Sequence, residues 1–375
     1  MDFTLTSDQS MIKASVERFV AENYAFAKRS ERVNAPGFSR EHWSTFAELG
    51  WLGLPIPAER GGFGGTAIDT AILLEAFGAG LVTEPFIPAV VVAGSVLAAA
   101  SGTHAQAMLD DLIAGTSLVT LGYLEPHAGY DPANVRTTAV RDGDSLVIDG
   151  AKVAVPFAAS ADWAIVSVRT PDDAGAGTVT LVSIPHDAAG FSRRDYDTYD
   201  ERRASDLTFS NVRVPADHVL GPAGGGLALL DAALDRGNVA LCAEAVGIMG
   251  VLQRGTVDYL KTRVQFGRPI GSFQALQHRA VDMLVQLEMA RAITTFAAAS
   301  IDTGDALAAR RAAAAAKAQV ADSGRFVGES AIQLHGAIGL TEELFVGHYV
   351  KRLTMLQREL GDAAFAIQRY IATPA

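Results

Sequence analysis

The chain has 375 residues, of which 49% are hydrophobic and 19% are charged, so it has material for two or three folded domains. This composition excludes a disordered protein, and the formal net charge of -11 argues against a nucleic-acid surface, which is normally basic. The single cysteine, Cys242, excludes an internal disulfide and a multi-cysteine zinc site, and it fits a reducing cytoplasm.

The N-terminal region has the pattern of a helical domain. The chain begins with MDFTLTSDQS, which has neither the basic nor the apolar region of a signal peptide. Apolar residues recur at helical spacing from about residue 5 to residue 118, and Ser7 is a candidate N-cap of the first helix. The most apolar stretch, Pro88 to Ser101, is shorter than the roughly 20 residues needed to span a bilayer. We read it as a buried helix, and we expect a cytoplasmic protein without membrane insertion.

Between about residues 119 and 222 the pattern changes to short runs rich in Val, Thr and Ile. Examples are SLVIDGAKVAV, WAIVSVRT and TVTLVSI. Turn signals such as Asp142-Gly143 and Asp149-Gly150 separate these runs. The region therefore reads as an antiparallel β domain.

Long helical segments return after residues 224–226 and continue to the C-terminus. The Ala-rich tract at residues 306–318 contains strong helix formers, which favours a helix packed closely on its neighbours. Cys242 lies in the apolar run NVALCAEAVG, where nothing nearby would lower its pKa, so we expect an inert core thiol.

Glycine and histidine patterns give little sign of a nucleotide loop or a metal site. The clusters at residues 61–65 and 224–226 lack the strand-before, helix-after context of a P-loop or a dinucleotide fingerprint, so turns are favoured. The eight histidines have no H-x-x-x-H or H-E-x-x-H spacing, and no metal is expected.

The segment TRVQFGRPIGSFQALQH, residues 262–278, collects groups suited to a nucleotide diphosphate. Arg263 is a fixed cation with a planar fork of donors, Gln265 and Gln274 add neutral donors and acceptors, and Phe266 offers an aromatic face. The Gly-Arg-Pro sequence breaks the helical pattern, so these groups gather at a helix junction. Taken alone, the segment is equally compatible with an amphipathic helix pair in which Arg263 is solvated.

The order of these residues, followed at a distance by QLHGAIG, resembles the acyl-CoA dehydrogenase family of flavoproteins. The segments ELGWLGLPIPAERGGFGG, LEPHAGYD and DGAKVAVPFAASADWAIV fall in the family's order, so the resemblance covers essentially the whole chain. It is closest to the small subunits of two-subunit bacterial enzymes such as pimeloyl-CoA dehydrogenase. The resemblance implies an α+β fold with an N-terminal helical domain (1–118), a middle antiparallel β-barrel or sandwich domain (119–222) and a C-terminal four-helix bundle (223–375).

The resemblance also implies an FAD cofactor bound across a subunit interface, and hence at least a dimer. Two motifs of this sequence match the family's FAD contacts. The implied cofactor-binding residues are Arg263, Gln265, Phe266, Gln274, Gln333, Leu334, His335 and Gly336.

The family's reaction removes an α-proton from an acyl-CoA thioester by a carboxylate base while a β-hydride passes to the flavin. The usual base precedes a glycine in a Y-E-G-T segment, but here that position is Leu360, with Glu359 one residue before it. A second location used by some members falls on Gly237, with Asp235 close by. The catalytic residue is therefore unknown, with Glu359 and Asp235 as candidates.

Each nearby carboxylate also has a structural explanation. Glu359 suits a solvent-facing helix residue beside Arg358, and Asp235 suits a local ion pair with its neighbour Arg236. Asp362, a further candidate base, suits the N-cap of the final helix.

Several positions that contact the flavin ring in typical members also differ. Leu124 and Tyr130 stand where those members have Thr and Ser, and Ala154 and Pro156 stand where they have Trp and Thr. Ala337 replaces the second glycine of the usual Q-x-x-G-G.

Three functional hypotheses follow from the resemblance. The chain is the smaller subunit of an α2β2 acyl-CoA dehydrogenase whose larger homologous subunit carries the base, a self-sufficient homo-oligomeric dehydrogenase with a displaced base, or a non-catalytic structural partner. The implied partners are an acyl-CoA substrate, of fatty acid, dicarboxylate or steroid side-chain type, and an electron-transferring flavoprotein as acceptor. A dimer of dimers is expected.

Overall fold

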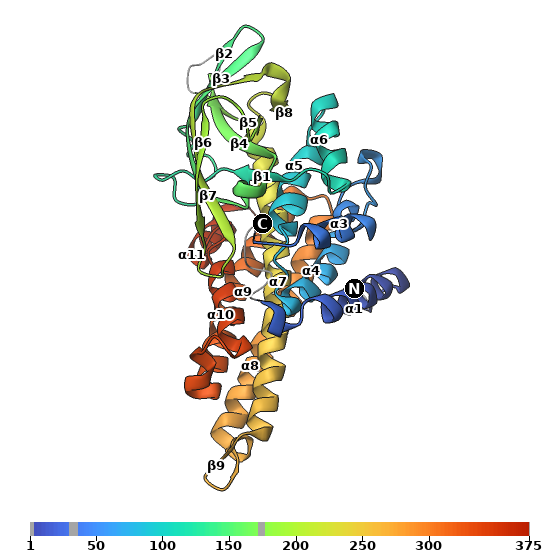
Figure 1. Cartoon of the computed structure of the whole chain (residues 1–375), viewed down its shortest axis with the longest axis vertical. Helices are drawn as coiled ribbons and strands as arrows, with labels where there is room; N and C mark the ends of the chain where they lie inside the picture. Colours follow the sequence, from blue (N-terminus) through green and yellow to red (C-terminus); the bar gives the residue numbers. More distant parts are fainter. Residues whose placement is uncertain (1–3, 30–36, 172–176, 375) are drawn as a thin grey trace. The chain divides into compact units, whose positions relative to one another are not determined.

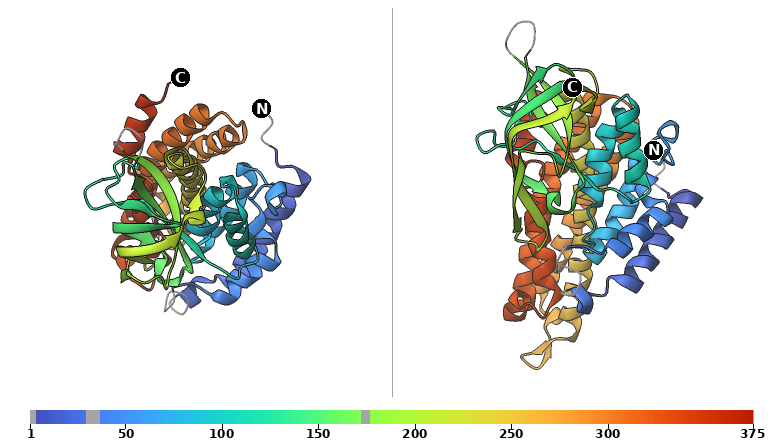
Figure 2. Two further views of the ribbon diagram at one scale, coloured as in Figure 1. Left: turned by 90° about the horizontal axis from the view of Figure 1, so that it is seen from above. Right: turned by 45° about the horizontal axis from the view of Figure 1, so that its top comes forward.

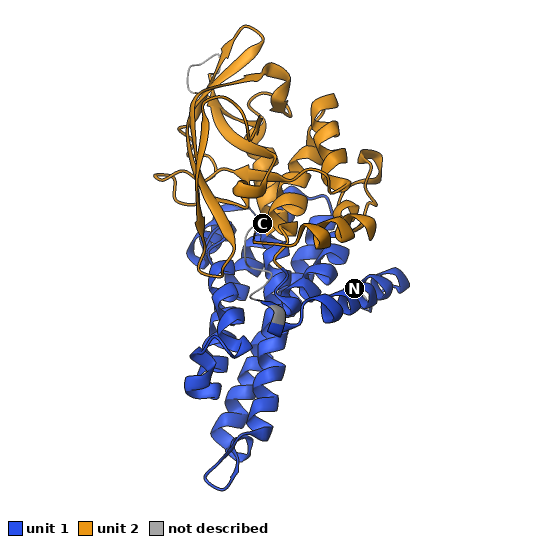
Figure 3. Ribbon diagram, viewed as in Figure 1, with its two compact units in different colours: residues 1–31, 66–82, 238–375 blue, residues 32–65, 83–237 orange. Residues whose placement is uncertain are grey.

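The computed structural model describes residues 4–29, 37–171 and 177–374 of the chain (Figure 1). The chain divides into two compact units, shown in Figure 3. Unit 1 comprises residues 1–31, 66–82 and 238–375, and unit 2 comprises residues 32–65 and 83–237. Within the described residues, no helix is both long enough and apolar enough to cross a membrane.

Unit 1 is helical apart from one short hairpin. Its short turns are Phe26–Lys28, Ile270–Ser272 and Gly336–Leu340. Its helices are α1 (Ser7–Asn23), α4 (Ala67–Gly80), most of α7 (Gly226–Thr262), α8 (Gln274–Asp302), α9 (Ala306–His335), α10 (Phe345–Leu356) and α11 (Ala363–Ala372).

Helix α1 begins with a reciprocal cap. The Gln9 amide donates to Thr6 Oγ1 at 3.2 Å, and the Thr6 amide donates to Gln9 Oε1 at 3.1 Å. This capping box satisfies two backbone donors that the first turn leaves open. The N-cap is therefore Thr6, and the prediction of Ser7 was wrong by one position because the partner side chain lies three residues beyond Thr6.

Helices α4 and α7 cross with their backbones in contact. A methyl group added to Gly78 would lie 2.0 Å from the carbonyl oxygen of Glu244, and one added to Gly247 would lie 1.9 Å from the carbonyl oxygen of Glu75. A glycine on each helix thus permits an approach that any side chain would block.

Helices α8 and α9 are joined by residues 303–305 and lie side by side in antiparallel directions (Figures 1 and 2). Asp305 caps α9 by accepting hydrogen bonds from the amides of Leu307 and Ala308. Arg279 Nε donates to Ser330 Oγ at 3.2 Å, so the start of α8 lies beside the end of α9. The prediction of a closely packed Ala-rich helix is confirmed by the buried residues Ala309, Ala312, Ala313, Ala314 and Ala316.

The helices of unit 2 include one unusual segment. Its regular helices are α3 (Arg40–Glu48), α5 (Gly94–Ala99), α6 (Thr103–Ile113) and the start of α7; its short turns are Trp51–Gly53, Ala58–Arg60, Ala158–Ser160 and Ala216–His218. The apolar stretch Pro88 to Ser101, which was predicted to be a buried helix, is mostly buried, but its first part belongs to a π-helix, Phe86–Ala93. This wider turn contains Pro88, which has no N–H for a helical bond.

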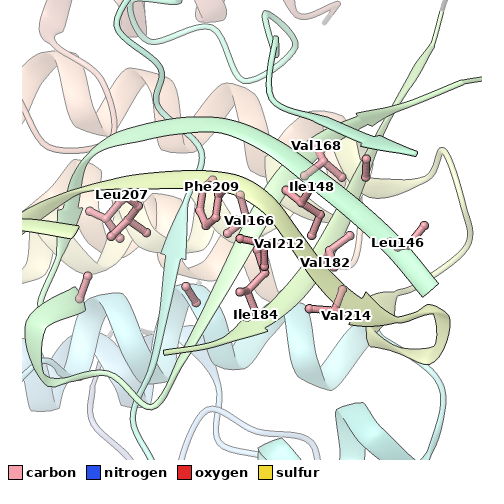
Figure 4. Close-up of a cluster of buried hydrophobic side chains, with 14 residues drawn as sticks. Leu146, Ile148, Val166, Val168, Val182, Ile184, Leu207, Phe209, Val212 and Val214 are labelled. Carbon is pink, nitrogen blue, oxygen red and sulfur yellow. The ribbon is translucent and has the colours of Figure 1, made fainter. Parts of the chain in front are cut away.

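The rest of unit 2 is an eight-stranded sheet. Its order is β6-β7-β3-β2-β4-β5-β8, with β1 pairing β4. Side chains from β3, β4, β5 and β7 form its core, including Ile148, Val166, Ile184 and Phe209 (Figure 4). The strands are β1 (Val119–Gly122), β2 (Thr138–Asp142), β3 (Ser145–Pro156), β4 (Trp163–Thr170), β5 (Thr178–Pro185), β6 (Phe191–Asp197), β7 (Arg203–Pro215) and β8 (Val219–Leu220).

Most strand pairs are antiparallel, as predicted, but β4 pairs with β1 and β2 in parallel. Neighbours joined by a tight turn must be antiparallel, whereas residues 123–162 separate β1 from β4 and allow the parallel arrangement. The order of helices, strands and helices along the chain is confirmed.

Candidate functional site

The predicted helix junction in unit 1 is a two-stranded hairpin. Helix α7 ends at Thr262, Val264–Gln265 then pairs with Arg268–Pro269, and α8 begins at Gln274. The central turn residues Phe266 and Gly267 have φ angles of 50° and 77°. Two left-handed residues at the centre of a hairpin match the twist of its strands, which explains the tight reversal.

The hairpin presents its side chains to solvent. Residues 261–269 are all exposed, and Phe266 is 90% exposed. Phe273 meets Phe266 edge-on with ring centroids 6.1 Å apart, and the Arg268 guanidinium lies 4.2 Å from the Phe273 ring centroid. The Arg263 side chain makes no hydrogen bond or ion pair within the part of the chain that the structure describes. Its donors are therefore open to a ligand.

The N-terminus of α8 adds positive potential beside the hairpin. Its N-cap residue, Phe273, supplies no side-chain hydrogen bond to the open backbone amides. The positive end of a helix with free amides favours an anion. Gln265 and Gln274 are both exposed there, so this end of unit 1 combines two exposed arginines, two amides and a helix terminus.

The second predicted motif forms the end of α9. Gly336 has a φ of 67° and a ψ of −147°, and its amide donates to the carbonyls of Ile332 and Gln333. A Cβ added to Gly336 would meet nothing within 4 Å, so glycine is needed for conformation and the backbone is open. Gln333 is exposed, but Leu334 and His335 are 6% and 5% exposed. Their side chains pack inside, and the surface of this motif comes from Gln333 and Gly336.

The two motifs lie at one end of the helical unit. The Tyr259 ring, in the last turn of α7, stacks on the His335 ring with centroids 4.4 Å apart. The bond from Arg279 to Ser330 ties the start of α8 to the end of α9 in the same way. Sequence reasoning missed Tyr259, which lies on α7 four residues before Arg263 in the chain.

The candidate base Glu359 is engaged by a buried cation. Arg352, 2% exposed, places Nη1 at 2.5 Å from Glu359 Oε1 and donates Nε and Nη2 to the Glu244 carboxylate at 2.7 Å and 2.8 Å. The partner of Glu359 is thus Arg352, seven residues away, rather than the adjacent Arg358. Leu360, at the position where the resemblance predicts the base, has a φ of 56°.

Lys317, on α9, holds the turn that contains these residues. Its ammonium group donates to the carbonyl oxygens of Leu356 at 2.5 Å and Glu359 at 2.7 Å. Burial lowers the pKa of Lys317 to about 8. Asn238 Nδ2 lies 3.5 Å from the Leu360 carbonyl oxygen, so side chains from α7, α9 and α10 fix the turn.

The remaining titratable candidates have defined places. Asp362 caps α11 by accepting a hydrogen bond from the Phe365 amide at 2.9 Å. Burial raises the pKa of the Cys242 thiol to about 12, which fits the predicted inert core residue. Asp235 lies on the part of α7 in unit 2 and is 4% exposed.

Unit 2 brings its two predicted motifs together through a buried ion pair. Lys152 is 0% exposed, and its Nζ lies 2.6 Å from Glu125 Oε1 and 2.9 Å from Ser167 Oγ. Burial lowers the pKa of Lys152 to about 8, although Glu125 opposes the shift. Burial would raise the pKa of Glu125, but the bonds from Lys152 and from the Thr137 and Arg136 amides lower it overall.

The positions matched to the flavin ring lie in the same two segments as this pair. Ala154 has a φ of 53° at a register shift between β3 and β7, and its amide donates to Asp206 Oδ1 at 3.1 Å. Leu124, Tyr130 and Pro156 are partly buried. Of the four positions, Tyr130 is the one with a side-chain hydrogen-bonding group.

Comparison with known proteins agrees with this architecture. The chain matches the N-terminal domain of acyl-CoA dehydrogenases at residues 6–116, the middle domain at 120–212 and the C-terminal domain at 224–368. It is 32% identical to "Probable acyl-CoA dehydrogenase YngJ" of Bacillus subtilis, over 99% of this chain and 98% of that protein.

Two solved structures are similar over nearly their whole length. Butyryl-CoA dehydrogenase from Megasphaera elsdenii has a TM-score of 0.91 and 26% identity, covering 99% of this chain and 98% of that one. A Tcur3481-Tcur3483 steroid ACAD has a TM-score of 0.87 and 28% identity, covering 98% and 97%. These matches span all three domains of the enzymes, and the chain therefore belongs to the acyl-CoA dehydrogenase family.

Proposed function

We propose that this chain, in a family that dehydrogenates acyl-CoA thioesters with FAD, is the smaller subunit of an α2β2 enzyme. It contributes to FAD binding, and a larger homologous subunit supplies the base. The observation that carries the proposal is the engagement of Glu359 by Arg352 beside Leu360. The usual base position holds a leucine, and the neighbouring carboxylate would have to leave a buried guanidinium before it could take a proton.

The residues of the hairpin fit the diphosphate and adenine parts of FAD. The open donors of Arg263 and the positive end of α8 suit phosphate oxygens. The exposed ring of Phe266 offers a face for stacking. Gln265 and Gln274 are exposed beside them and add donors and acceptors for the remaining polar atoms.

The end of α9 fits a close backbone approach. Gly336 leaves its surroundings open, and Gln333 offers an exposed amide. Leu334 and His335 support this segment from inside, so we assign them a packing role in the proposed site. Ala337, where most members have glycine, is exposed and adds one methyl group to the same surface.

The reaction places separate demands on the protein and the cofactor. FAD, when bound, supplies the acceptor for the hydride that leaves Cβ of the acyl chain. The protein must remove the α-proton with a positioned carboxylate and donate hydrogen bonds to the thioester carbonyl. The Leu360 side chain can do neither, and of the positions matched to ring contacts, Leu124, Ala154 and Pro156 carry no side-chain donor. The missing base and the missing side-chain donors support the proposal that a partner subunit completes the site.

A self-sufficient homo-oligomer is the alternative that a specific observation favours. Asp235 is a carboxylate almost wholly buried on α7, close to a base location used by some members of the family. A chain that reduces its own flavin with a thioester, and loses that ability on Asp235→Asn, would replace the two-subunit proposal.

The acyl group and the electron acceptor follow from analogy alone. The similarity to a steroid ACAD supports a steroid side-chain thioester, and the small-subunit resemblance supports a dicarboxylyl-CoA. An electron-transferring flavoprotein is the proposed acceptor, and the assembly is proposed to be a dimer of dimers.

The cofactor assignment is tested by flavin content. Arg263→Met in the assembled protein is expected to raise the dissociation constant of FAD by about ten- to a hundredfold, because a charged hydrogen bond to phosphate is lost. Arg325→Met is the matched control, since Arg325 is an exposed arginine on α9 that pairs with Asp322. Equal FAD affinity of both variants would contradict the assignment.

A further inference from the structure

Tyr259 joins the two cofactor motifs of unit 1 through separate parts of the same residue. Its carbonyl oxygen accepts the Arg263 amide at 2.8 Å, at the point where α7 gives way to the hairpin. Its ring stacks on His335, with an interplanar angle of 28°. Its hydroxyl lies 3.4 Å from the His335 carbonyl oxygen, the last peptide before Gly336.

His335 is held as a neutral, internal ring. Burial lowers its pKa, which favours the uncharged imidazole. Nδ1 lies 2.8 Å from the Ala331 carbonyl oxygen, so Nδ1 carries the proton and donates. The ring is therefore tied to its own helix and packed against Tyr259.

A third helix closes the other side of this ring. Phe345, the first residue of α10, meets His335 edge-on at 6.2 Å. A Cβ on Gly255 would lie 2.4 Å from Phe345 Cζ, so glycine on α7 makes room for the phenyl ring. The end of α9 is thus set between two aromatic rings from α7 and α10.

We infer that Tyr259 is a positioning residue for FAD, which fixes the Gln333–Gly336 segment relative to Arg263. This inference rests on the proposed cofactor site. Without the Tyr259 ring, His335 loses one wall of its pocket, and the left-handed Gly336 turn loses its fixed distance from the hairpin. The cofactor would then have to order the segment itself, which lowers its affinity.

Tyr349 provides a matched control. It is a buried tyrosine on α10 whose ring contacts Phe345 at 5.8 Å, one ring further from the cofactor segment. Its hydroxyl donates to the Ala79 carbonyl oxygen at 2.6 Å, away from α9. Its removal therefore disturbs the same aromatic cluster through Phe345.

The test compares Tyr259→Leu with Tyr349→Leu in the assembly that binds FAD in its unmodified form. Dissociation constants of FAD are measured by the recovery of flavin fluorescence on dilution. Tyr259→Leu is expected to raise the constant about tenfold, from the loss of an aromatic contact and a hydrogen bond. Tyr349→Leu is expected to change it less than twofold, although it is the more buried residue. Equal effects of the two variants would overturn the inference.

A second measurement does not depend on the leucine variants. In FAD-free Tyr259→Phe protein, which keeps the ring and loses the hydroxyl, amide hydrogen exchange at residues 333–338 is expected to quicken about threefold while residues 346–356 keep their rates. Unchanged exchange at residues 333–338 would overturn the inference. If the unmodified assembly binds no FAD, the proposed function itself fails; if it binds FAD and Tyr259→Leu is silent, the inference alone fails.

Discussion

Arg352 places Nη1 at 2.5 Å from Glu359 Oε1, and two further nitrogens of the same guanidinium donate hydrogen bonds to the buried Glu244 carboxylate. One cation with almost no exposure thus serves two carboxylates. Glu359 stands next to the expected base position, but its oxygens are directed to Arg352. Glu359 is therefore close to the expected base position, but its bonds to Arg352 do not suit it to act as the base.

Glu359→Gln is therefore expected to leave most of the activity of the complete enzyme. The amide retains one acceptor for Arg352, and the rate of flavin reduction by an acyl-CoA should stay within about threefold of the unmodified value. Loss of a true general base removes about a hundredfold or more. Stopped-flow reduction of the flavin distinguishes the two, and a hundredfold loss would make Glu359 the base.

The buried pair of Glu125 and Lys152 predicts a large stability effect. Glu125→Gln leaves the wholly buried Lys152 without its counter-charge, and breaking a buried pair in this way costs about 3–5 kcal/mol. Asp142→Asn breaks an exposed pair with Arg213 in the same unit, and it should cost less than about 1 kcal/mol. Urea unfolding of both variants measures the difference, and similar midpoints would refute the argument.

The crossing of α4 and α7 predicts opposite outcomes for two glycines in helix interiors. Gly247→Ala puts a methyl group 1.9 Å from a backbone oxygen of α4, so it should destabilise by about 1–3 kcal/mol or more. Gly324→Ala on α9 meets only a Leu353 methyl at 3.4 Å, and helix propensity should make it neutral or stabilising by up to about 1 kcal/mol. Thermal unfolding of the two proteins provides the comparison, which fails if Gly247→Ala is tolerated as well.

A stacked histidine pair in unit 2 predicts a pH dependence. His104 and His218 lie ring on ring at 4.1 Å, and His104 Nε2 lies 2.8 Å from Ser183 Oγ. Burial and the neighbouring His218 lower the pKa of His104, while Asp217 opposes them. As pH falls through about 6.5, His104 therefore takes up a proton in the unfolded chain before it does so in the folded chain. The contribution of His104 to the free energy of unfolding is present above that pH and is lost as pH falls below it.

His104→Gln should flatten this dependence between pH 7 and pH 5. One proton accounts for at most about 1.4 kcal/mol per pH unit. The control is His186→Gln, an exposed histidine of the same unit whose ring bonds to the Asp162 backbone carbonyl. Melting temperatures across this range test the point, and an unchanged slope in His104→Gln would count against it.

The sequence predicted the structural features that depend on local residue pattern and on the order of motifs. The break at Gly267 and Pro269, the Ala-rich helix and the change from helices to strands near residue 119 are all local features, and each is confirmed. The cap at Thr6 and the π-helix at Phe86–Ala93 were missed because they depend on a single side-chain pairing and on a rare helix geometry.

The features that could not be predicted from the sequence depend on packing between residues far apart in the chain. Glu244 lies 108 positions from Arg352, and no spacing rule links them. Leu334 and His335 stand in a predicted cofactor motif, yet their burial follows from α7 and α10 closing around the end of α9. The inferred positioning role of Tyr259 likewise depends on the packing of α7 and α10 around the end of α9.

The most direct test of the two-subunit account is anaerobic reduction of the flavin by acyl-CoA thioesters, with the chain purified alone and then co-expressed with a larger related chain. The account predicts that the chain alone does not bleach with any thioester, whether it is colourless or yellow, and that the complex is yellow and bleaches. A chain that is yellow and bleaches on its own would contradict it, because the chain would then contain its own base.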